Sequence, residues 1–371
     1  MSQKVNPYQV EGKINYDKLV KEFGVKKITP EILKEIEKMA GELHPYLRRG
    51  IFFAYRDLKK VLDEYKKGNK FFLYTGRAPS GPIHLGHISV WLFMKWIQEK
   101  FGVEVWFQFP DEEKFLFKKD ANWEEIQKWL HENMLDVIAL GFDPKKTHFL
   151  IDTKHAGIMY PEAIKVAKKI TFSSIKAAFG FSDSSNIGSI FYTAMQTVPT
   201  FLPNILKKEK RPCLIPLGID QDVHFRLSRD VVEKLGYQKP AIIHAKFMPP
   251  LTGIEGKMSS SSPDSAILLT DSPGEVKRKI NKYAFSGGRD TAEEHRKHGG
   301  NVEVDVACQW LKYFEEDDKK LEKIYKDYRE GKLLSGEVKK ILIDKINEFL
   351  AEHQKRRKNA GKLIDKFVYK I

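Results

Sequence analysis

Cysteine is almost absent from this chain: Cys213 and Cys308 are the only two among 371 residues. Two cysteines so far apart cannot form a disulfide framework or supply a four-cysteine zinc or iron–sulfur site. The sequence also lacks an apolar run near the roughly 20 residues that cross a bilayer, and MSQKVNPYQVEGKINYDK at its start lacks the apolar core of a signal peptide. We therefore expect a soluble, cytoplasmic protein without protein-bound zinc or iron–sulfur cluster and without a membrane partner.

An excess of acidic charge is lacking as well, because 64 lysines and arginines outnumber 50 aspartates and glutamates. The formal net charge is +14 at pH 7. Lysine and arginine side chains neutralise phosphates and release their counterions, so this balance favours a polyanionic partner such as a nucleic acid. The length exceeds the roughly 100 to 200 residues of one typical domain, which predicts two or three packed domains.

Strand-like and helix-like segments alternate from Lys70 onward. FFLYT and VEVWFQF have the composition of buried strands, and a helix of about 18 residues that starts near His84 separates them. The alternation continues through WEEIQKWLHENMLDVIAL, THFLID, PEAIKVAKKI, IFYTAMQ, PCLIPLGI and KPAIIHAKFM. This order predicts an α/β fold on a doubly wound, Rossmann-like parallel sheet that binds ligands beyond the carboxyl ends of its strands.

The segments before and after this alternation have helical patterns. Residues 28–68 predict two helices separated by Pro45, the first of them capped by Thr29 before Pro30. Beyond Lys277 the pattern is purely helical. We therefore expect an N-terminal extension with helices packed on the main domain (1–68), the sheet domain (69–275) and a helical domain (276–371).

The stretch PSGPIHLGH follows the end of a predicted strand and opens a long apolar helix. Gly81 and Gly86 would let the backbone approach a flat ligand such as ATP closely, and a helix N-terminus offers N–H groups to phosphate. His84 and His87 could donate hydrogen bonds to phosphate oxygens whose charge grows during displacement at the α-phosphorus. Two histidines at this spacing could instead be zinc ligands or partly exposed residues of a capped helix, but no further ligands at a suitable spacing accompany them.

A second cationic stretch is needed, because a leaving pyrophosphate carries more charge than two neutral imidazoles can stabilise. GKMSSSSP, residues 256–263, contains Lys257 as the cation and serines as hydroxyl donors, and its flanking glycine and proline are typical of a loop. Alone, such a stretch is usually a solvated turn. It follows the last predicted strand, so a doubly wound sheet could bring it to the same edge as PSGPIHLGH.

The two stretches resemble the HIGH and KMSKS signatures of class I aminoacyl-tRNA synthetases and occur in the same order. HLGH differs by one aliphatic exchange. Ser260 stands where the family pattern has a second lysine, so Lys257 is expected to carry the charge alone. Arg77 could contact the nucleotide or the substrate, or could equally form a structural salt bridge. The resemblance implies catalytic roles for His84, His87 and Lys257 and an ATP site of Arg77, Gly81, His84, Gly86, His87, Lys257, Met258, Ser259 and Ser260.

Nearly the whole chain is similar to the tryptophanyl-tRNA synthetases of the archaeal and eukaryotic cytosolic type. The matching segments are INYDKLVKEFG, LRRGIFFAYRDL, FFLYTGRAPSG, IDQDVHFRLSRDV and AFSGGRDTAEEHRKHGGN. The resemblance implies that Tyr74 and Gln108 accept a hydrogen bond from the indole N–H of L-tryptophan and that Glu113 holds its ammonium group. Lys114, Gln196 and Gln221 are the other implied contacts. Any one of these residues alone would be read as an ordinary strand or turn residue.

The resemblance also implies a reaction and partners. The carboxylate of L-tryptophan would attack the α-phosphorus of ATP, accompanied by Mg²⁺, and tRNA(Trp) would then receive the acyl group on a homodimeric enzyme. Arg289 and Asp290 of SGGRD would lie in a helical anticodon-binding domain, although a plain interdomain turn is the alternative. VNPYQV, with Tyr8, resembles a hairpin that folds over the active site, or is a loosely ordered terminus. We expect HQKRRKNAGK to be the solvated face of a helix.

Three alternatives are open. A tyrosyl-tRNA synthetase of the same subclass has a similar glutamine segment, but it has an aspartate three residues after that glutamine, where this chain has Pro199 without a side-chain acceptor. A small-molecule nucleotidyltransferase could use an HxGH site but would not need the helical domain. A noncatalytic tRNA-binding paralogue would be expected to have decayed signatures, whereas HLGH, DEEK and KMSS are present.

Overall fold

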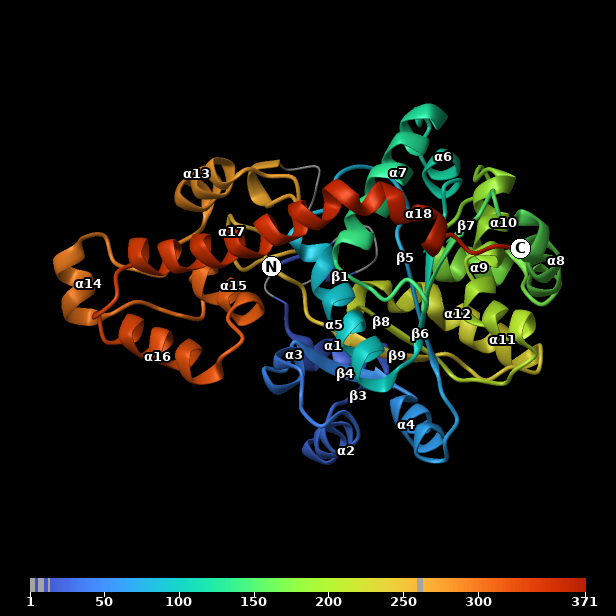
Figure 1. Cartoon of the computed structure of the whole chain (residues 1–371), viewed down its shortest axis with the longest axis horizontal. Helices are drawn as coiled ribbons and strands as arrows, with labels where there is room; N and C mark the ends of the chain where they lie inside the picture. The colour runs from blue at the N-terminus through green and yellow to red at the C-terminus, as the bar shows by residue number, and fades with distance from the viewer. Residues whose placement is uncertain (1–3, 6–9, 13, 259–262) are drawn as a thin grey trace.

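The computed structural model describes residues 4–5, 10–12, 14–258 and 263–371 (Figure 1). Its centre is a seven-stranded sheet with the strand order β3–β4–β9–β8–β5–β6–β7. The five strands from β9 to β7 are parallel, as predicted. Their bounds are Phe72–Gly76 (β5), Glu104–Phe109 (β6), Thr147–Ile151 (β7), Cys213–Gly218 (β8) and Ala241–Ala245 (β9).

The parallel strands are buried on both faces. Around β5, Phe71 and Leu73 belong to one hydrophobic core, whereas Phe72 and Tyr74 belong to the other. Because successive side chains of a strand point to opposite faces, a strand covered on both sides needs consecutive apolar residues. This is the physical reason why FFLYT and VEVWFQF are apolar without interruption.

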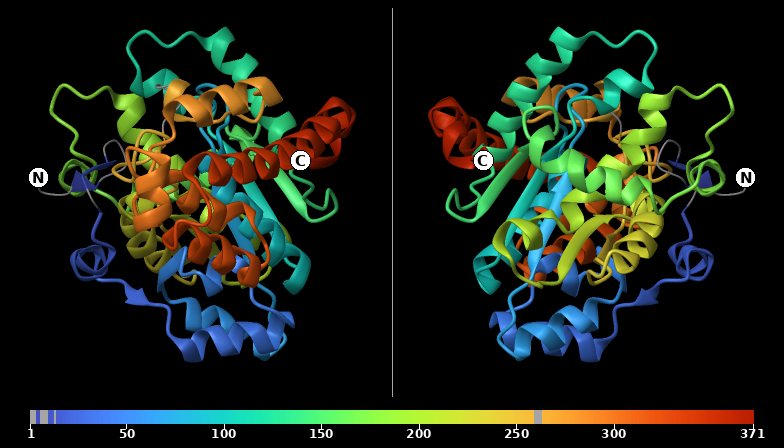
Figure 2. Two further views of the ribbon diagram at one scale, coloured as in Figure 1. Left: turned by 90° about the vertical axis from the view of Figure 1, so that its left-hand side faces the viewer. Right: turned by 90° about the vertical axis from the view of Figure 1, so that its right-hand side faces the viewer.

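Helices cover both faces of the sheet, so the sheet is doubly wound (Figure 2). One core includes side chains of α2 (Pro30–Ala40), α3 (Pro45–Arg48), α4 (Leu58–Lys66), α5 (Leu85–Phe101) and α7 (Trp123–Ala139). The other core includes side chains of α8 (Ala156–Ala167), α10 (Ile187–Met195), α11 (Leu202–Lys207) and α12 (Asp222–Lys234). Shorter helices are α1 (Tyr16–Phe23), α6 (Glu113–Phe117) and α9 (Phe172–Phe179).

The prediction of two helices in residues 28–68 is wrong in its second half. Helix α2 begins directly after Thr29, as expected, and Pro45 is the first residue of α3. After α3, however, the chain forms β4 (Phe52–Arg56), which pairs antiparallel with β9 and with β3 (Lys26–Lys27). The partner strand β9 lies far along the chain, and a local periodicity cannot reveal such a pairing. The sheet therefore extends into the segment that we assigned to the N-terminal extension.

The C-terminal part of the chain is helical, as predicted, and extends away from the sheet (Figure 1). Its helices are α13 (Pro273–Tyr283), α14 (Ala292–His298), α15 (Val306–Phe314), α16 (Asp318–Arg329), α17 (Ser335–Ala360) and α18 (Ile364–Phe367). Short 3-10 turns occupy Val198–Thr200, Ile219–Gln221, Pro263–Ser265 and Gly361–Leu363. Within the described residues, no helix is long and apolar enough to cross a membrane.

HQKRRKNAGK, at the end of α17, is not simply a solvated helix face. His353 is fully buried, and its Nε2 lies 3.1 Å from the backbone oxygen of Asp136 in α7. Arg357 forms ion pairs with Asp136 and Glu132, which both belong to α7. Lys355 remains exposed. The basic stretch therefore packs against α7, and it has one buried face.

Candidate active site

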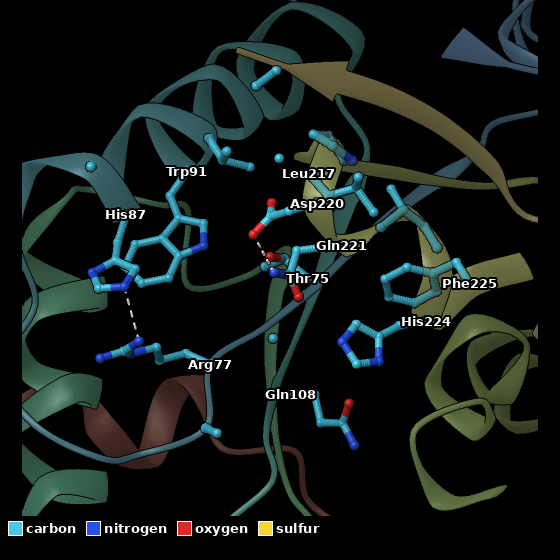
Figure 3. A pocket seen from close by; sticks show the side chains of 18 of the residues that line it. Thr75, Arg77, His87, Trp91, Gln108, Leu217, Asp220, Gln221, His224 and Phe225 are labelled. Carbon is cyan, nitrogen blue, oxygen red and sulfur yellow. Dashed lines mark hydrogen bonds between the residues drawn. The ribbon is translucent and has the colours of Figure 1, made fainter. Parts of the chain in front are cut away.

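A cavity of about 480 Å³ lies at the carboxyl ends of the parallel strands (Figure 3). Strand β5 lies between β8 and β6, so the order of the strands along the chain changes direction at β5. Open α/β sheets bind ligands at such a switch point. Most of the predicted site residues line this cavity: Tyr74, Arg77, His84, Gly86, His87, Gln108, Glu113, Lys114, Gln196, Gln221, Lys257 and Met258.

Three residues predicted for the ATP site, and Tyr8, do not line the cavity or lie outside the described part of the chain. Arg289 and Asp290, predicted for the tRNA, do not line it either. Gly81 is buried in the preceding loop with φ of +152°, and its carbonyl accepts a hydrogen bond of 3.0 Å from Asn133. Ser259 and Ser260 lie outside the described residues. Tyr8 does too.

The two histidines sit at the start of α5, where His84 is the N-cap residue. Their rings stack with centroids 3.6 Å apart, and the backbone N–H of His84 donates to Nδ1 of His87 over 3.3 Å. Burial lowers the pKa of His84 to about 3, with further contributions from Arg77 and Lys257. Burial and Arg77 hold the pKa of His87 well below its usual range. Both imidazoles are therefore neutral hydrogen-bonding groups at pH 7.

Gly86 brings the two signature stretches together. A Cβ at this position would lie 3.0 Å from Nδ1 of His84 and 3.3 Å from Cβ of Met258. Such contacts are too tight for an ordinary side chain, so glycine permits the loop that carries Lys257 to touch the start of α5. The backbone supports this arrangement, because the amide of Leu85 donates to Ile267 over 3.0 Å.

Lys257 is held at the cavity by Asp220. The ammonium nitrogen of Lys257 lies 2.6 Å from Oδ2 of Asp220, and Gln221 donates to the same oxygen over 2.8 Å. Strand β2 (Val10–Glu11), which pairs with β1 (Lys4–Val5), lies nearby: a Cβ on Gly256 would be 3.2 Å from the backbone oxygen of Val10. Strand β2 thus approaches the stretch that carries Lys257.

Arg77 presents unsatisfied donors to this region. Its Nη1 lies 3.0 Å from Nε2 of His87 (Figure 3), whereas its Nε and Nη2 are buried without a hydrogen-bond partner. In the part of the chain that the structure describes, Arg77 forms no salt bridge with a carboxylate. Burial lowers the pKa of Arg77 to about 10, still well above 7, so the group stays cationic. A buried guanidinium with free donors requires an anion nearby.

His87 adds to this requirement. A neutral imidazole accepts a hydrogen bond at one ring nitrogen only. Nδ1 of His87 lies 3.3 Å from the backbone N–H of His84, and its Nε2 lies 3.0 Å from Nη1 of Arg77, and both of these neighbours can only donate. The ring can accept from one of them, so in either tautomer its own N–H faces the other donor. Two donors that face one another are satisfied together when an acceptor such as a phosphate oxygen lies between them.

The opposite part of the cavity has groups suited to an amino acid. The hydroxyl of Tyr74 donates to Oε1 of Gln108 over 2.5 Å. Glu113 accepts from Lys114 over 2.8 Å and from the hydroxyl of Tyr192 over 3.0 Å. Burial raises the pKa of Glu113, but Lys114, His224 and Tyr192 outweigh it, and the net shift is downward. An ionised carboxylate therefore lies inside the cavity.

Several lining residues were not predicted. Asp220 lies in the 3-10 turn that directly follows β8, so the rule that ligand groups follow strand ends could have found it. Tyr192 lies inside α10, and His224 inside α12, where no local pattern distinguishes them from core residues. Within the described residues, no group of three or more His, Cys, Asp or Glu side chains is placed to hold a metal ion.

The depressed histidine pKa values predict a pH-dependent stability. In the unfolded chain the histidines bind protons near pH 6.5, whereas in the native state they stay neutral to a lower pH. The free energy of unfolding therefore falls as the pH drops below about 6.5. We expect His84 to account for about 2 kcal/mol of this loss between pH 6.5 and 5. Urea unfolding of the wild type and of His84→Asn at pH 7 and pH 5 measures it. Equal pH dependence in both proteins would contradict the assignment.

Comparison with known proteins agrees with this geometry. Residues 66–351 match the model of the class I tRNA synthetases for tryptophan and tyrosine. The tryptophan–tRNA ligase of Saccharolobus solfataricus is 52% identical over 98% of this chain and 95% of its own length. The crystal structure of the Plasmodium falciparum tryptophanyl-tRNA synthetase, 44% identical, superposes with a TM-score of 0.91 over 96% of this chain and 98% of its own. A tryptophan-bound enzyme from Encephalitozoon cuniculi, 36% identical, superposes with a TM-score of 0.89 over 96% of this chain and 98% of its own.

The Rossmann-like sheet and the two signature stretches at one cavity define a class I aminoacyl-tRNA synthetase. Within this class, the chain belongs to the tryptophanyl-tRNA synthetase family, the tryptophan–tRNA ligases.

Proposed function

We propose that this chain activates L-tryptophan with ATP and transfers the acyl group to tRNA(Trp), with the residues of the cavity in the roles that follow. The observation that carries this proposal is the distribution of charge in one cavity. Arg77 and Lys257 lie with two neutral imidazoles on the side of the α5 N-terminus, and the ionised Glu113 lies among aromatic and amide groups. This matches a triphosphate on one side and an amino acid on the other.

In the first step, a carboxylate oxygen of tryptophan forms a bond to the α-phosphorus of ATP, and the bond from that phosphorus to the bridging oxygen breaks. Pyrophosphate leaves with the electron pair of the broken bond and carries its negative charge. His84 and His87 donate hydrogen bonds to the phosphate oxygens, and Arg77 supplies the donors that are unsatisfied without a ligand. Lys257 moves from Asp220 to the leaving pyrophosphate. Mg²⁺ accompanies ATP and neutralises part of the phosphate charge.

Tryptophan would lie with its indole N–H toward Gln108 and its ammonium group toward Glu113. The free lone pair of the Gln108 carbonyl can accept from the indole, and the Glu113 carboxylate balances the ammonium charge. Lys114, Gln196 and Gln221 would contact the polar end of the amino acid. No covalent enzyme intermediate is needed for either step.

Pro199 stands where a related tyrosyl enzyme has an aspartate that accepts from the substrate phenol. This residue is buried in the 3-10 turn Val198–Thr200 and does not line the cavity. It cannot accept a hydrogen bond from a substrate phenol. A site that left a buried phenol unpaired would reject tyrosine strongly.

Charging of tRNA(Trp) tests this function directly. The purified full chain should attach labelled tryptophan to tRNA(Trp) in the presence of ATP and Mg²⁺, and labelled tyrosine should give no product. Activation of tryptophan without any charging would favour a small-molecule nucleotidyltransferase, and neither activity would favour a noncatalytic tRNA-binding protein.

We further propose that residues 276–371 bind the anticodon, residues 69–275 carry catalysis, and residues 1–68 form an extension packed on them. Helix α14 lies at the end of the molecule remote from the sheet (Figure 1). Arg289 and Asp290 are exposed just before α14 in the chain. The chain beside them is tightly packed: a Cβ on Gly288 would lie 2.3 Å from Oγ of Ser335. A rigid turn that presents an arginine and a carboxylate suits the recognition of unstacked bases.

Replacement of both Arg289 and Asp290 by alanine should lower kcat/KM for tRNA charging by about tenfold or more, since contacts to bases contribute about 1–3 kcal/mol. Tryptophan-dependent exchange of pyrophosphate into ATP should not change. Glu37→Gln serves as the control, because the side chain of Glu37 is exposed on α2. An equal loss in charging and exchange would show that the two residues act on folding or on the cavity instead.

A homodimer and a cytoplasmic location complete the proposal. Large apolar side chains are exposed on neighbouring helices α8, α9 and α10, among them Tyr160, Phe172 and Ile187, the last of which is 83% exposed. Such a patch suits burial against a second copy of the chain, which sedimentation equilibrium would detect. Both cysteines are buried and unpaired, which suits a reducing compartment.

A further inference from the structure

Gln108 has a second hydrogen-bond partner behind it. Its Nε2 donates to Oδ2 of Asp152 over 2.6 Å, while its Oε1 accepts from Tyr74 over 2.5 Å. Asp152 directly follows β7, and only 1% of its surface is exposed. It does not line the cavity. The Gln108 amide thus connects the cavity to a carboxyl group that the substrate cannot reach.

The orientation of this amide decides what the cavity recognises. The two ends of a glutamine amide have nearly the same shape, but one accepts and the other donates. In the observed orientation the oxygen faces the cavity side, where it can accept from an indole N–H. After a half-turn of the amide, an NH₂ group would meet the indole N–H, and two donors would face one another. Tyr74 cannot prevent this turn, because a hydroxyl can both donate and accept.

Asp152 is itself held by a second buried carboxyl. Glu112 lies beside Asp152, and Oδ1 of Asp152 and Oε2 of Glu112 are both buried without a hydrogen-bond partner among the described residues. Burial raises the pKa of both groups, and Asp111 beside them adds to this shift. Two buried carboxyls in contact cannot both be ionised, so one proton lies between them. A proton shared between Oδ1 of Asp152 and Oε2 of Glu112 would satisfy both unpaired oxygens and leave Oδ2 of Asp152 as the acceptor for Gln108.

We propose that Asp152, together with the neighbouring Glu112, holds the Gln108 amide with its oxygen toward the substrate. The site then selects an amino acid whose side chain donates an N–H hydrogen bond. Asp152 is a positioning residue, since it acts through Gln108 and does not touch the substrate. The inference rests on the proposed contact between Gln108 and the indole.

The test compares tryptophan with β-(3-benzothienyl)alanine, in which sulfur replaces the indole N–H in a ring of nearly the same shape. The quantity measured is the ratio of kcat/KM values for the two amino acids in pyrophosphate exchange into ATP. In Asp152→Asn, residue 152 can donate to Gln108 as well as accept from it, so the amide can turn. We expect the ratio to fall on the order of tenfold, mainly through lost activity with tryptophan. A purely structural role would lower both activities equally and leave the ratio unchanged.

Two further variants keep the test decisive if Asp152→Asn folds poorly. Glu112→Gln should retain the ratio, because a glutamine amide can still donate to Oδ1 of Asp152. The double variant Gln108→Glu/Asp152→Asn exchanges the carboxyl and the amide, so residue 108 keeps an oxygen on the cavity side. It should recover most of the ratio that Gln108→Glu alone loses.

The outcomes separate the two levels of the proposal. An unchanged ratio in Asp152→Asn, or no recovery in the double variant, overturns the role of Asp152 while the wild type still prefers tryptophan. A wild type that uses both amino acids equally well overturns the contact between Gln108 and the indole, and the inference with it.

Discussion

Lys257→Ala should lower the rate of adenylate formation by about 10²–10³-fold while the dissociation constant for tryptophan changes by about twofold at most. The ammonium group of Lys257 is paired with Asp220 before reaction. Its charge is therefore most useful when pyrophosphate departs, because charge develops only then. Single-turnover adenylation and equilibrium dialysis with labelled tryptophan measure the two quantities.

Lys282→Ala is the matched control, since Lys282 is an exposed lysine on α13 outside the cavity. It should leave both quantities unchanged. Lys257→Arg should keep part of the rate, because it preserves the charge but not the shape of the ammonium group. A Lys257→Ala enzyme that lost only tryptophan binding would refute the role of this lysine.

Glu113→Gln should have the opposite kinetic signature, with KM for tryptophan raised by about 10²-fold and kcat changed much less. The carboxylate lies inside the cavity and is ionised, so its removal leaves the substrate ammonium without a counter-charge. Removing one partner of a buried ion pair costs about 3–5 kcal/mol, and the amide of glutamine offsets part of this. Steady-state pyrophosphate exchange over a range of tryptophan concentrations measures both constants.

Glu124→Gln, an exposed glutamate on α7, is the control for Glu113→Gln. If Glu113→Gln lowered kcat and left KM unchanged, Glu113 would stabilise the transition state and not the bound amino acid. The pair of variants Lys257→Ala and Glu113→Gln therefore tests whether the two sides of the cavity have separate roles.

The central part of the fold could be predicted because its signals are local. The uninterrupted apolar strand FFLYT reflects burial on both faces, and α5 starts within a residue of the expected position because HLGH is a helix start. Strand β4 could not be predicted, because FFAYR becomes a strand only by pairing with β9. The buried face of α17 was also hidden, since Arg357 looks like any surface arginine until Asp136 lies beside it.

The same distinction between local signals and contacts of distant residues applies to the candidate site. Residues in short signatures, such as His84 and Lys257, could be named from the sequence, and both line the cavity. The pairing of Lys257 with Asp220 could not be predicted, because it forms only through the loop that folds back to α5. The acid pair of Glu112 and Asp152 is equally hard to predict, since the two residues follow different strands and become neighbours only in the folded chain.

Amino-acid-dependent exchange of labelled pyrophosphate into ATP tests the central claim most directly, with tryptophan, tyrosine and phenylalanine measured side by side on the full chain. Exchange with tryptophan alone is the result predicted by the ionised Glu113, the Gln108 acceptor and the absence of an acceptor at Pro199. Exchange with tyrosine at a comparable rate would keep the adenylation chemistry but contradict the proposed pocket, and no exchange with any of the three would contradict the proposed activation step.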